Sequence, residues 1–223
     1  MEKDQRICAI HDAAVRLFLR QGYAQTQFNH IAKAAGVAIG TVYHDFAGKE
    51  ELLCYILKCA MEPSFAQRTL PLPITKDLFP DLDNQMIAVL EETADTYAAN
   101  LSRVGWGYAF QDLLSDTFDL LSRYAVGCLM IERNPLLRPV LTAYYRHYRE
   151  TFFSTITAYL ERFQTCGQLR PMKEPELVAV LILEQLSWWA MDIRWTAYET
   201  ADISPERAKA VCLDNLLAAY AVG

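Results

Sequence analysis

The sequence lacks the residue patterns that mark common catalytic and metal sites. It contains no Gly-x-Ser-x-Gly, no His-Glu-x-x-His, no Walker-type glycine loop and no dinucleotide-binding glycine motif. Only four histidines occur, and three of them lie at positions 11, 30 and 44. The carboxylates of Asp112, Asp116 and Asp119 are spaced like a solvated helix face. We therefore expect no enzymatic activity, no cofactor and no metal site.

Cysteine pairs and long apolar runs are also missing. None of the six cysteines forms a Cys-x-x-Cys pair, so the pattern favours reduced thiols packed as small apolar residues. A redox role for Cys54 with Cys59 is the alternative. The longest apolar stretch, residues 177–183, is far shorter than the roughly 20 residues that a membrane span needs. Because the charged start at residues 2–6 is unlike a signal peptide, we expect a cytoplasmic protein without a membrane partner.

The net charge of −6 argues at first against a nucleic-acid partner. However, residues 1–60 hold seven Lys/Arg and six Asp/Glu, so the excess of acid lies in residues 61–223. The N-terminal quarter is therefore the part that can approach phosphate without general repulsion.

Apolar residues recur at helical spacing through almost the whole chain, and no alternating strand pattern with hairpin turns occurs. Thr26 is expected to cap the second helix. Ser204, followed by a proline and an acid, is a strong helix start. The sequence predicts helices over 4–21, about 26–35, 39–44, from 49 onward, 84–101, 106–131, 135–166, 174–198 and 204–221.

Four prolines interrupt the helical pattern at positions 63, 71, 73 and 80. Proline removes a backbone donor and fixes φ, so a continuous helix is disfavoured there. We place the domain connection in this stretch, with one domain over residues 1–62 and the second over 63–223.

The segment from Ile31 to Phe46 reads as two short helices joined by a tight turn. Gly36 suits a turn position with positive φ, and the small Ala32 lets the helices approach closely. Ile31, Val37 and Val42 can form the small core that fixes the crossing angle. These features are typical of a helix-turn-helix. The predicted fold is all-α, with an N-terminal three-helix helix-turn-helix domain and a C-terminal helical bundle.

Further residues at fixed spacing extend this pattern over about residues 5–57. They are Gly22-Tyr23, Thr26, Ile31-Ala32, Ala35-Gly36-Val37, Gly40-Thr41-Val42-Tyr43, Phe46 and Lys49-Glu50-Glu51-Leu52. With these residues in this order, the sequence resembles the DNA-binding domain of TetR-family regulators. The resemblance implies a ligand-responsive, DNA-binding transcriptional regulator; a repressor released by its ligand is the commoner behaviour, and activation stays open.

The resemblance makes residues 38–44 the recognition helix. Ile39 would meet a thymine methyl and Thr41 a base edge, while Tyr43, His44 and Thr26 would reach phosphate oxygens, with Lys49 adding a cation. Tyr43 as a core residue and His44 as an ordinary surface residue are the alternatives. The expected DNA contacts are Thr26, Ala38, Ile39, Gly40, Thr41, Tyr43, His44 and Lys49.

Two residues depart from the family pattern. Ala38 and Ile39 stand where the family commonly has polar or basic side chains. We therefore expect fewer charged contacts and a shallower salt dependence of DNA binding. A helical ligand-binding module that has lost DNA recognition is the alternative.

The C-terminal part is rich in aromatic residues, and the resemblance implies a ligand cavity there. We expect a largely apolar small-molecule effector with one or two polar groups. The alternative is that most of these rings fill the core, as rings at helical spacing usually do. The expected ligand contacts are Trp106, Tyr108, Phe110, Tyr145, Tyr148, Phe152 and Trp188.

Broad apolar bands run along residues 174–198 and 204–221. Two such helices from each subunit can close a four-helix bundle, and the resemblance implies dimerisation through them. A two-fold homodimer would present two recognition helices to a palindromic operator in double-stranded DNA.

Overall fold

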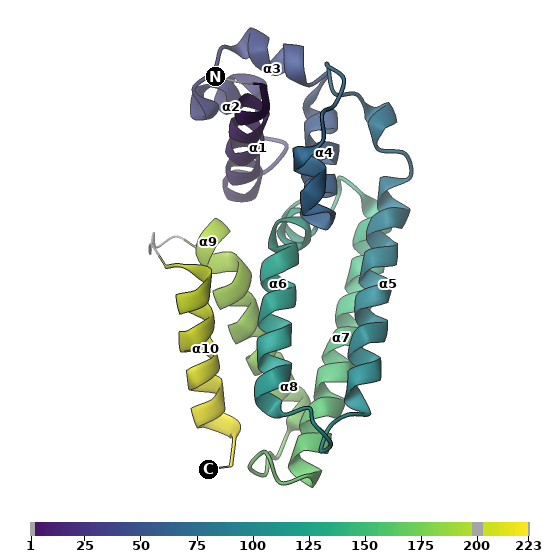
Figure 1. The fold of residues 1–223 in the computed structure, drawn as a ribbon, viewed down its shortest axis with the longest axis vertical. Helices are drawn as coiled ribbons and strands as arrows, with labels where there is room; N and C mark the ends of the chain where they lie inside the picture. The colour runs from purple at the N-terminus through teal and green to yellow at the C-terminus, as the bar shows by residue number, and fades with distance from the viewer. Residues whose placement is uncertain (1–2, 198–202, 223) are drawn as a thin grey trace. The chain divides into compact units, whose positions relative to one another are not determined.

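The computed structural model describes residues 3–197 and 203–222, which fold as α-helices joined by turns and by one longer connection between α4 and α5 (Figure 1). Three isolated β-bridges are the only strand-like pairings in these ranges, so the predicted all-α class is confirmed. No helix of the described residues is long and apolar enough to cross a membrane. The α-helices are α1 (Lys3–Arg20), α2 (Phe28–Ala35), α3 (Ile39–Asp45), α4 (Lys49–Met61), α5 (Leu82–Leu101), α6 (Phe110–Arg133), α7 (Pro139–Thr165), α8 (Pro175–Ser187), α9 (Ile193–Trp195) and α10 (Pro205–Tyr220).

Local chemistry explains where several helices begin. α6 starts at Phe110 rather than at 106, because Gly105 and Gly107 adopt φ values of 85° and 118° that a helix does not allow. α7 starts at Pro139 rather than at 135, with proline in the first turn where its missing N–H costs nothing. α10 starts as predicted, since Ser204 Oγ accepts a hydrogen bond from the Arg207 backbone N–H at 3.3 Å.

Three short helical segments complete the secondary structure. Two 3₁₀ turns lie in the proline-containing stretch, η1 over Pro63–Gln67 and η2 over Lys76–Leu78. A π-helical turn, η3 over Trp188–Asp192, joins α8 to α9. The predicted helix over 174–198 is therefore interrupted by a wider turn.

The chain forms two compact units. Unit 1 comprises Met1–Met86 and Val126–Thr142, and unit 2 comprises Ile87–Ala125 and Ala143–Gly223. The division falls within α5, α6 and α7. It does not coincide with the boundary at residue 62 that the prolines indicate, because residues 63–86 pack with the N-terminal helices.

The core of unit 1 is formed by the inward faces of its first four helices. Ile10 and Phe18 of α1, Ile31 of α2, Val42 of α3 and Leu52 of α4 are all fully buried. Along α1 the buried residues Ile7, Ile10, Ala14 and Phe18 recur every three or four positions, as an amphipathic helix requires. Burial of such side chains contributes about 1.5–3 kcal/mol each relative to exposure.

The proline-containing stretch folds back onto the end of α3. Ile74 is fully buried, and its backbone N–H donates to Asp45 O at 2.8 Å. Its carbonyl accepts from the Ala47 N–H at 3.1 Å, and a parallel bridge joins Phe46 to Ile74. This stretch is therefore part of the support of the helix-turn-helix.

The core of unit 2 is built largely from aromatic rings. Tyr159 is fully buried and its hydroxyl donates to Tyr97 O at 2.5 Å, while Tyr97 donates to Thr117 Oγ1 at 3.2 Å. Tyr108 packs 5.8 Å from Tyr159, measured between ring centroids, and donates to Asp116 at 2.9 Å. Because each of these tyrosine hydroxyls has a hydrogen-bond partner, the rings can be buried in the core of unit 2 without an unpaired polar group.

Candidate nucleic-acid interface

The turn between α2 and α3 has the geometry of a helix-turn-helix. Gly36 lies in the left-handed region at φ 69°, and the Val37 N–H donates to Ala32 O at 3.0 Å. This left-handed residue closes the end of α2, and α3 follows after only two more residues. The role predicted for Gly36 agrees with the structure.

α3 packs through one face and leaves the other open to solvent. Val42 and the following Phe46 are fully buried. The exposed fractions of Ile39 and Tyr43 are 47% and 58%, and the side chain of His44 is 67% exposed. Ala38 and Gly40 are exposed and Thr41 is half-buried. The outer face of α3 therefore presents most of the residues expected to contact DNA.

A groove separates the start of α2 from α3. The Tyr43 ring packs edge-on against Phe28 with 4.9 Å between centroids, so one side of Tyr43 is supported while the rest stays exposed. Tyr43 thus combines the packing and surface roles that were alternatives in the sequence. The groove is lined by Thr26, Gln27, Phe28, Asn29, Ile39, Tyr43, Gly48 and Lys49.

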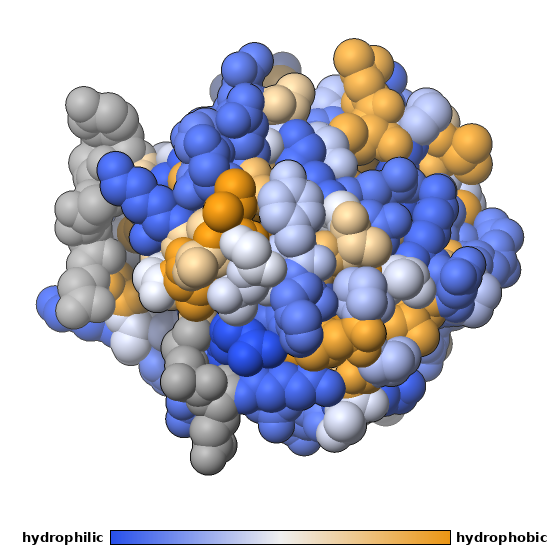
Figure 2. Space-filling model, turned by 90° about the horizontal axis from the view of Figure 1, so that it is seen from above, coloured by the Kyte–Doolittle hydropathy of each residue, from blue (hydrophilic) through white to orange (hydrophobic). Residues whose placement is uncertain are grey.

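Figure 2 shows the surface from above the view of Figure 1, the side on which α3 is drawn. It is mostly hydrophilic, and apolar side chains form small separate patches. Such a surface suits a partner that is polar and hydrated.

Thr26 differs from its predicted roles. It is fully buried; its hydroxyl donates to Gly22 O at 2.8 Å and accepts from Gln21 at 3.1 Å. α2 begins after Gln27, not after Thr26. The predictions that Thr26 caps this helix and that its side chain reaches phosphate are both wrong, because the hydroxyl closes the turn that follows α1.

Lys49 also has internal partners. Its ammonium donates to Tyr23 O at 2.8 Å and to Thr26 O at 2.9 Å, and it lies 4.2 Å from the centroid of the Tyr23 ring. Desolvation by burial lowers the pKa of this ammonium. Lys49 therefore ties the start of α4 to the α1–α2 turn, in addition to any contact it makes with DNA.

Replacing Lys49 by methionine is expected to lower the free energy of unfolding by about 1–2 kcal/mol, since two carbonyls lose a charged donor. Urea unfolding followed by circular dichroism measures this. Lys33→Met is the matched control, because Lys33 is exposed on α2 and should change stability by less than about 0.5 kcal/mol. A Lys49→Met variant as stable as the wild type would show that this side chain is not structural.

A buried carboxylate, Asp45, lies at the end of α3. It is fully buried and bonded at both oxygens by Arg6 of α1, with Nε 2.6 Å from Oδ2 and Nη2 2.7 Å from Oδ1. His44 Nδ1 lies 2.9 Å from Oδ1. Burial raises the pKa of Asp45, but the hydrogen bonds from Arg6 and His44 outweigh it, and the pKa is lowered overall. The sequence analysis missed this cluster because Arg6 and Asp45 are 39 positions apart.

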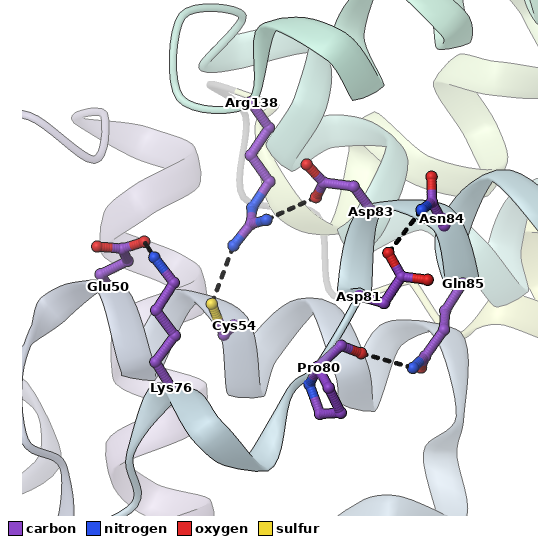
Figure 3. A network of polar contacts seen from close by, with 9 residues as sticks. All are labelled: Glu50, Cys54, Lys76, Pro80, Asp81, Asp83, Asn84, Gln85 and Arg138. Carbon is purple, nitrogen blue, oxygen red and sulfur yellow. Dashed lines mark hydrogen bonds and ion pairs between the residues drawn. The ribbon is translucent and has the colours of Figure 1, made fainter.

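A second polar network links α4 to other parts of unit 1 (Figure 3). Arg138 donates to Asp83 at 2.5 Å and to Cys54 Sγ at 2.9 Å, and Lys76 pairs with Glu50 at 2.8 Å. α4, the helix that follows α3, is thereby tied both to the segment that leads into α5 and to the segment that precedes α7.

Neither cysteine of the pair considered for redox chemistry is exposed. Cys54 and Cys59 are buried, and burial raises the pKa of both thiols, to about 12 for Cys59. Buried thiols in the protonated form are poor nucleophiles, so the structure favours the packing role.

The predicted ligand contacts do not form one cluster. Trp106 is 87% exposed in the glycine-flanked turn before α6, so its predicted place in an enclosed pocket is wrong. Phe110 and Tyr108 are core residues, and Trp188 is 44% exposed. Tyr145, Tyr148 and Phe152 form a stacked row along α7, with centroids 6.3 Å and 5.9 Å apart.

The apolar bands of the last helices divide into two parts. The residues Leu186 of α8, Met191 of η3, and Ala208, Cys212 and Leu216 of α10 are buried within the subunit. A second set stays in contact with solvent, and we call it the α8–α10 apolar face. It consists of Leu177 (57% exposed), Val180 (40%), Leu181 (62%), Trp188 (44%) and Val211 (42%).

Comparison with known proteins identifies the N-terminal segment. Residues 10–56, which run from α1 into α4, match the model of bacterial regulatory proteins of the tetR family. We call residues 10–56 the tetR-family domain, after the family model that they match. This tetR-family domain contains the whole helix-turn-helix, including Gly36 and the exposed face of α3.

Two curated regulators are similar to the tetR-family domain. A fatty acid metabolism regulator protein of Bacillus subtilis is 44% identical over 57 residues, which cover 26% of this chain and 29% of the relative. The HTH-type transcriptional regulator AcrR of Shigella flexneri is 47% identical over 47 residues, which cover 21% of this chain and 22% of the relative. The matches thus span less than a third of either relative.

The fold beyond the tetR-family domain is also found in a solved structure. The ketosteroid transcriptional regulator KstR2 of Mycobacterium tuberculosis aligns with a TM-score of 0.53 over 98% of this chain and 96% of its own. The sequence identity is 17%, so this similarity concerns the fold alone. The chain combines a tetR-family domain with a helical remainder of known architecture.

Proposed function

We propose that this chain is a DNA-binding transcriptional regulator whose α3 enters the major groove. The observation that carries the proposal is the two-sided packing of α3: Val42 faces the core, while Ile39 and Tyr43 stay exposed on a tetR-family domain. A short helix held in this way can present its first residues to base edges. We assign DNA recognition to residues 1–62, and sensing and dimerisation to 63–223.

Contacts within this interface follow from exposure and chemistry. Ala38, Ile39, Gly40 and Thr41 occupy the start of α3, where side chains reach base edges, and Ile39 offers an apolar surface for a thymine methyl. Tyr43 and His44, further along the helix, are assigned to phosphate oxygens.

Fluorescence anisotropy with DNA from upstream of the chain's own gene tests this function. We expect binding at least about 1,000-fold tighter than to a scrambled duplex. We also expect the logarithm of the affinity to fall only shallowly with the logarithm of the salt concentration, because few phosphate contacts form. Equal, weak affinity for both duplexes would instead support a helical ligand-binding module without DNA recognition.

We further propose that two copies associate through the α8–α10 apolar face. Five large apolar residues are exposed on adjacent elements, and a patch of this kind on a small protein commonly marks an interface. Binding of such a dimer to two half-sites of a palindromic operator requires the two α3 helices to lie about 34–36 Å apart, the spacing of successive major grooves.

Replacing Leu181 by glutamate should weaken this dimer at least about 100-fold, because two carboxylates, one from each subunit, would be buried in the interface or would prevent its closure. Sedimentation equilibrium measures the change. Leu136→Glu is the matched control, since Leu136 is 91% exposed on the α6–α7 turn and should leave the association unchanged. An unaltered dimer in Leu181→Glu would move the interface elsewhere.

We also propose a small, largely apolar effector that releases the chain from its operator. The half-buried Tyr148 and Phe152 are partly accessible within the stacked row along α7 and would pack against a flat ring. An effector shifts the regulator only if it binds the DNA-bound and free states with different affinity. The anisotropy measurement repeated with saturating 1-aminoanthracene, a flat apolar probe, should show weaker binding; unchanged affinity would argue against this effector class.

A further inference from the structure

The cluster of Arg6, His44 and Asp45 constrains where His44 carries its proton. Asp45 is fully buried, and its two oxygens receive hydrogen bonds from Arg6 at 2.6 Å and 2.7 Å. His44 Nδ1 lies 2.9 Å from Oδ1 of the same carboxylate. A carboxylate paired in this way with a guanidinium is ionised and can only accept hydrogen bonds. His44 Nδ1 must therefore be the donor.

This assignment fixes the chemistry of the other ring nitrogen. In a neutral imidazole one nitrogen donates and the other accepts, so a proton on Nδ1 leaves a lone pair on Nε2. Phosphate oxygens also only accept. Neutral His44 thus cannot donate to phosphate through Nε2, whereas the imidazolium can, with a positive charge in addition.

The exposure of the ring makes this difference relevant to DNA. The side chain of His44 is 67% exposed, and it follows Tyr43 on the outer face of α3. Because Nδ1 is directed at the buried carboxylate, the Nε2 edge faces away from it. The charged groups beside the His44 ring are Asp45 of α3 and Arg6 of α1. The ammonium of Lys3, also on α1, donates to Leu70 O in the adjacent segment at 2.8 Å.

We propose that DNA binding by this chain is linked to proton uptake at His44 Nε2, with Arg6 and Asp45 as positioning residues that hold Nδ1–H. The inference rests on the proposed function, because it concerns the contact between α3 and phosphate. One proton is bound for each His44–phosphate contact. Operator affinity therefore falls as the pH rises, because the neutral ring cannot donate from Nε2.

The test is the operator affinity measured from pH 5.5 to 8.0 at constant ionic strength. For the wild type we expect a loss of up to about tenfold per pH unit for each His44 contact, and at the low-pH end a salt slope steeper by about 0.9 per contact. His44→Gln should bind weakly and with little pH dependence. His44→Arg, which keeps a charge throughout, should bind tightly at all these pH values.

His30→Gln is the matched control, because His30 is an exposed histidine of the same helix-turn-helix that lacks the carboxylate partner. It should keep the pH dependence of the wild type. A wild type whose affinity does not change with pH, or a His44→Gln variant that keeps the slope, would overturn the inference. Absence of specific binding at every pH would instead contradict the proposed function.

A second measurement does not depend on DNA. Long-range ¹H–¹⁵N spectra of the free protein distinguish the two neutral histidine tautomers. In its neutral form the ring of His44 should carry its proton on Nδ1, the less common form in peptides, whereas an Nε2–H tautomer would refute the proposed hydrogen bond to Asp45.

Discussion

Replacing Asp45 by alanine is expected to lower the free energy of unfolding of unit 1 by about 3 kcal/mol. The change leaves the Arg6 guanidinium without its bidentate partner beneath α3. Breaking a buried pair on one side costs about 3–5 kcal/mol, and we take the lower end because the Arg6 side chain is still 21% exposed. Urea unfolding monitored by circular dichroism gives the value.

The double variant Arg6→Met/Asp45→Leu is the control for this prediction. Both charges are removed together, so no unpaired ion remains, and most of the lost stability should return. A loss below about 1 kcal/mol in Asp45→Ala would show that the pair contributes little to the stability of the domain.

Acid unfolding of the Asp45→Ala variant also tests the contribution of the Arg6–Asp45 pair. Because the folded-state pKa of Asp45 is lowered, its contribution is fully present above the ordinary aspartate pKa of about 3.9 and is lost as the pH falls through the folded-state value. The contribution of Asp45 to the stability difference between wild type and Asp45→Ala should therefore shrink as the pH falls below about 4.

Replacing Ile39 by aspartate is expected to reduce operator affinity at least about 100-fold without unfolding the domain. Ile39 is the first residue of α3 and is 47% exposed. A carboxylate at a helix N-terminus is compatible with the helix dipole, so the helix itself should tolerate the change. Toward DNA, the same carboxylate replaces an apolar contact by a charge of the wrong sign. Anisotropy measures the affinity, and circular dichroism verifies the fold.

Gln111→Asp is the matched control for Ile39→Asp. Gln111 is exposed in the first turn of α6, so the substitution makes the same change of charge in the same helical context. Its operator affinity should stay within about threefold of the wild type. Equal losses in the two variants would attribute the effect to net charge rather than to a contact of α3.

Local sequence rules were sufficient to predict most helices of this chain. Gly36 predicted the turn because a left-handed residue is needed there, and Ser204 with Pro205 predicted the start of α10. Such features depend on residues within one or two turns of each other, so periodicity and capping chemistry are enough to find them.

Other features depend on contacts between distant segments. Thr26 has the side chain of a helix cap, yet its hydroxyl donates to Gly22 O in the preceding turn. Ile74, within the proline-containing stretch, forms backbone hydrogen bonds with Asp45 and Ala47 at the end of α3. The glycines beside Trp106 indicate a turn, but not whether its ring faces the interior. These contacts cannot be predicted from composition and residue spacing, because they depend on the tertiary packing.

The backbone hydrogen bonds between Ile74 and the end of α3 affect how the proposed DNA preference could change during evolution. Two of the bonds that hold the end of α3 run between main-chain groups, from Ile74 to Asp45 and from Ala47 to Ile74. Main-chain bonds are largely indifferent to side-chain identity. Substitutions at residues 38–41 would therefore change the preferred DNA sequence, while the main-chain hydrogen bonds that hold the end of α3 stay in place.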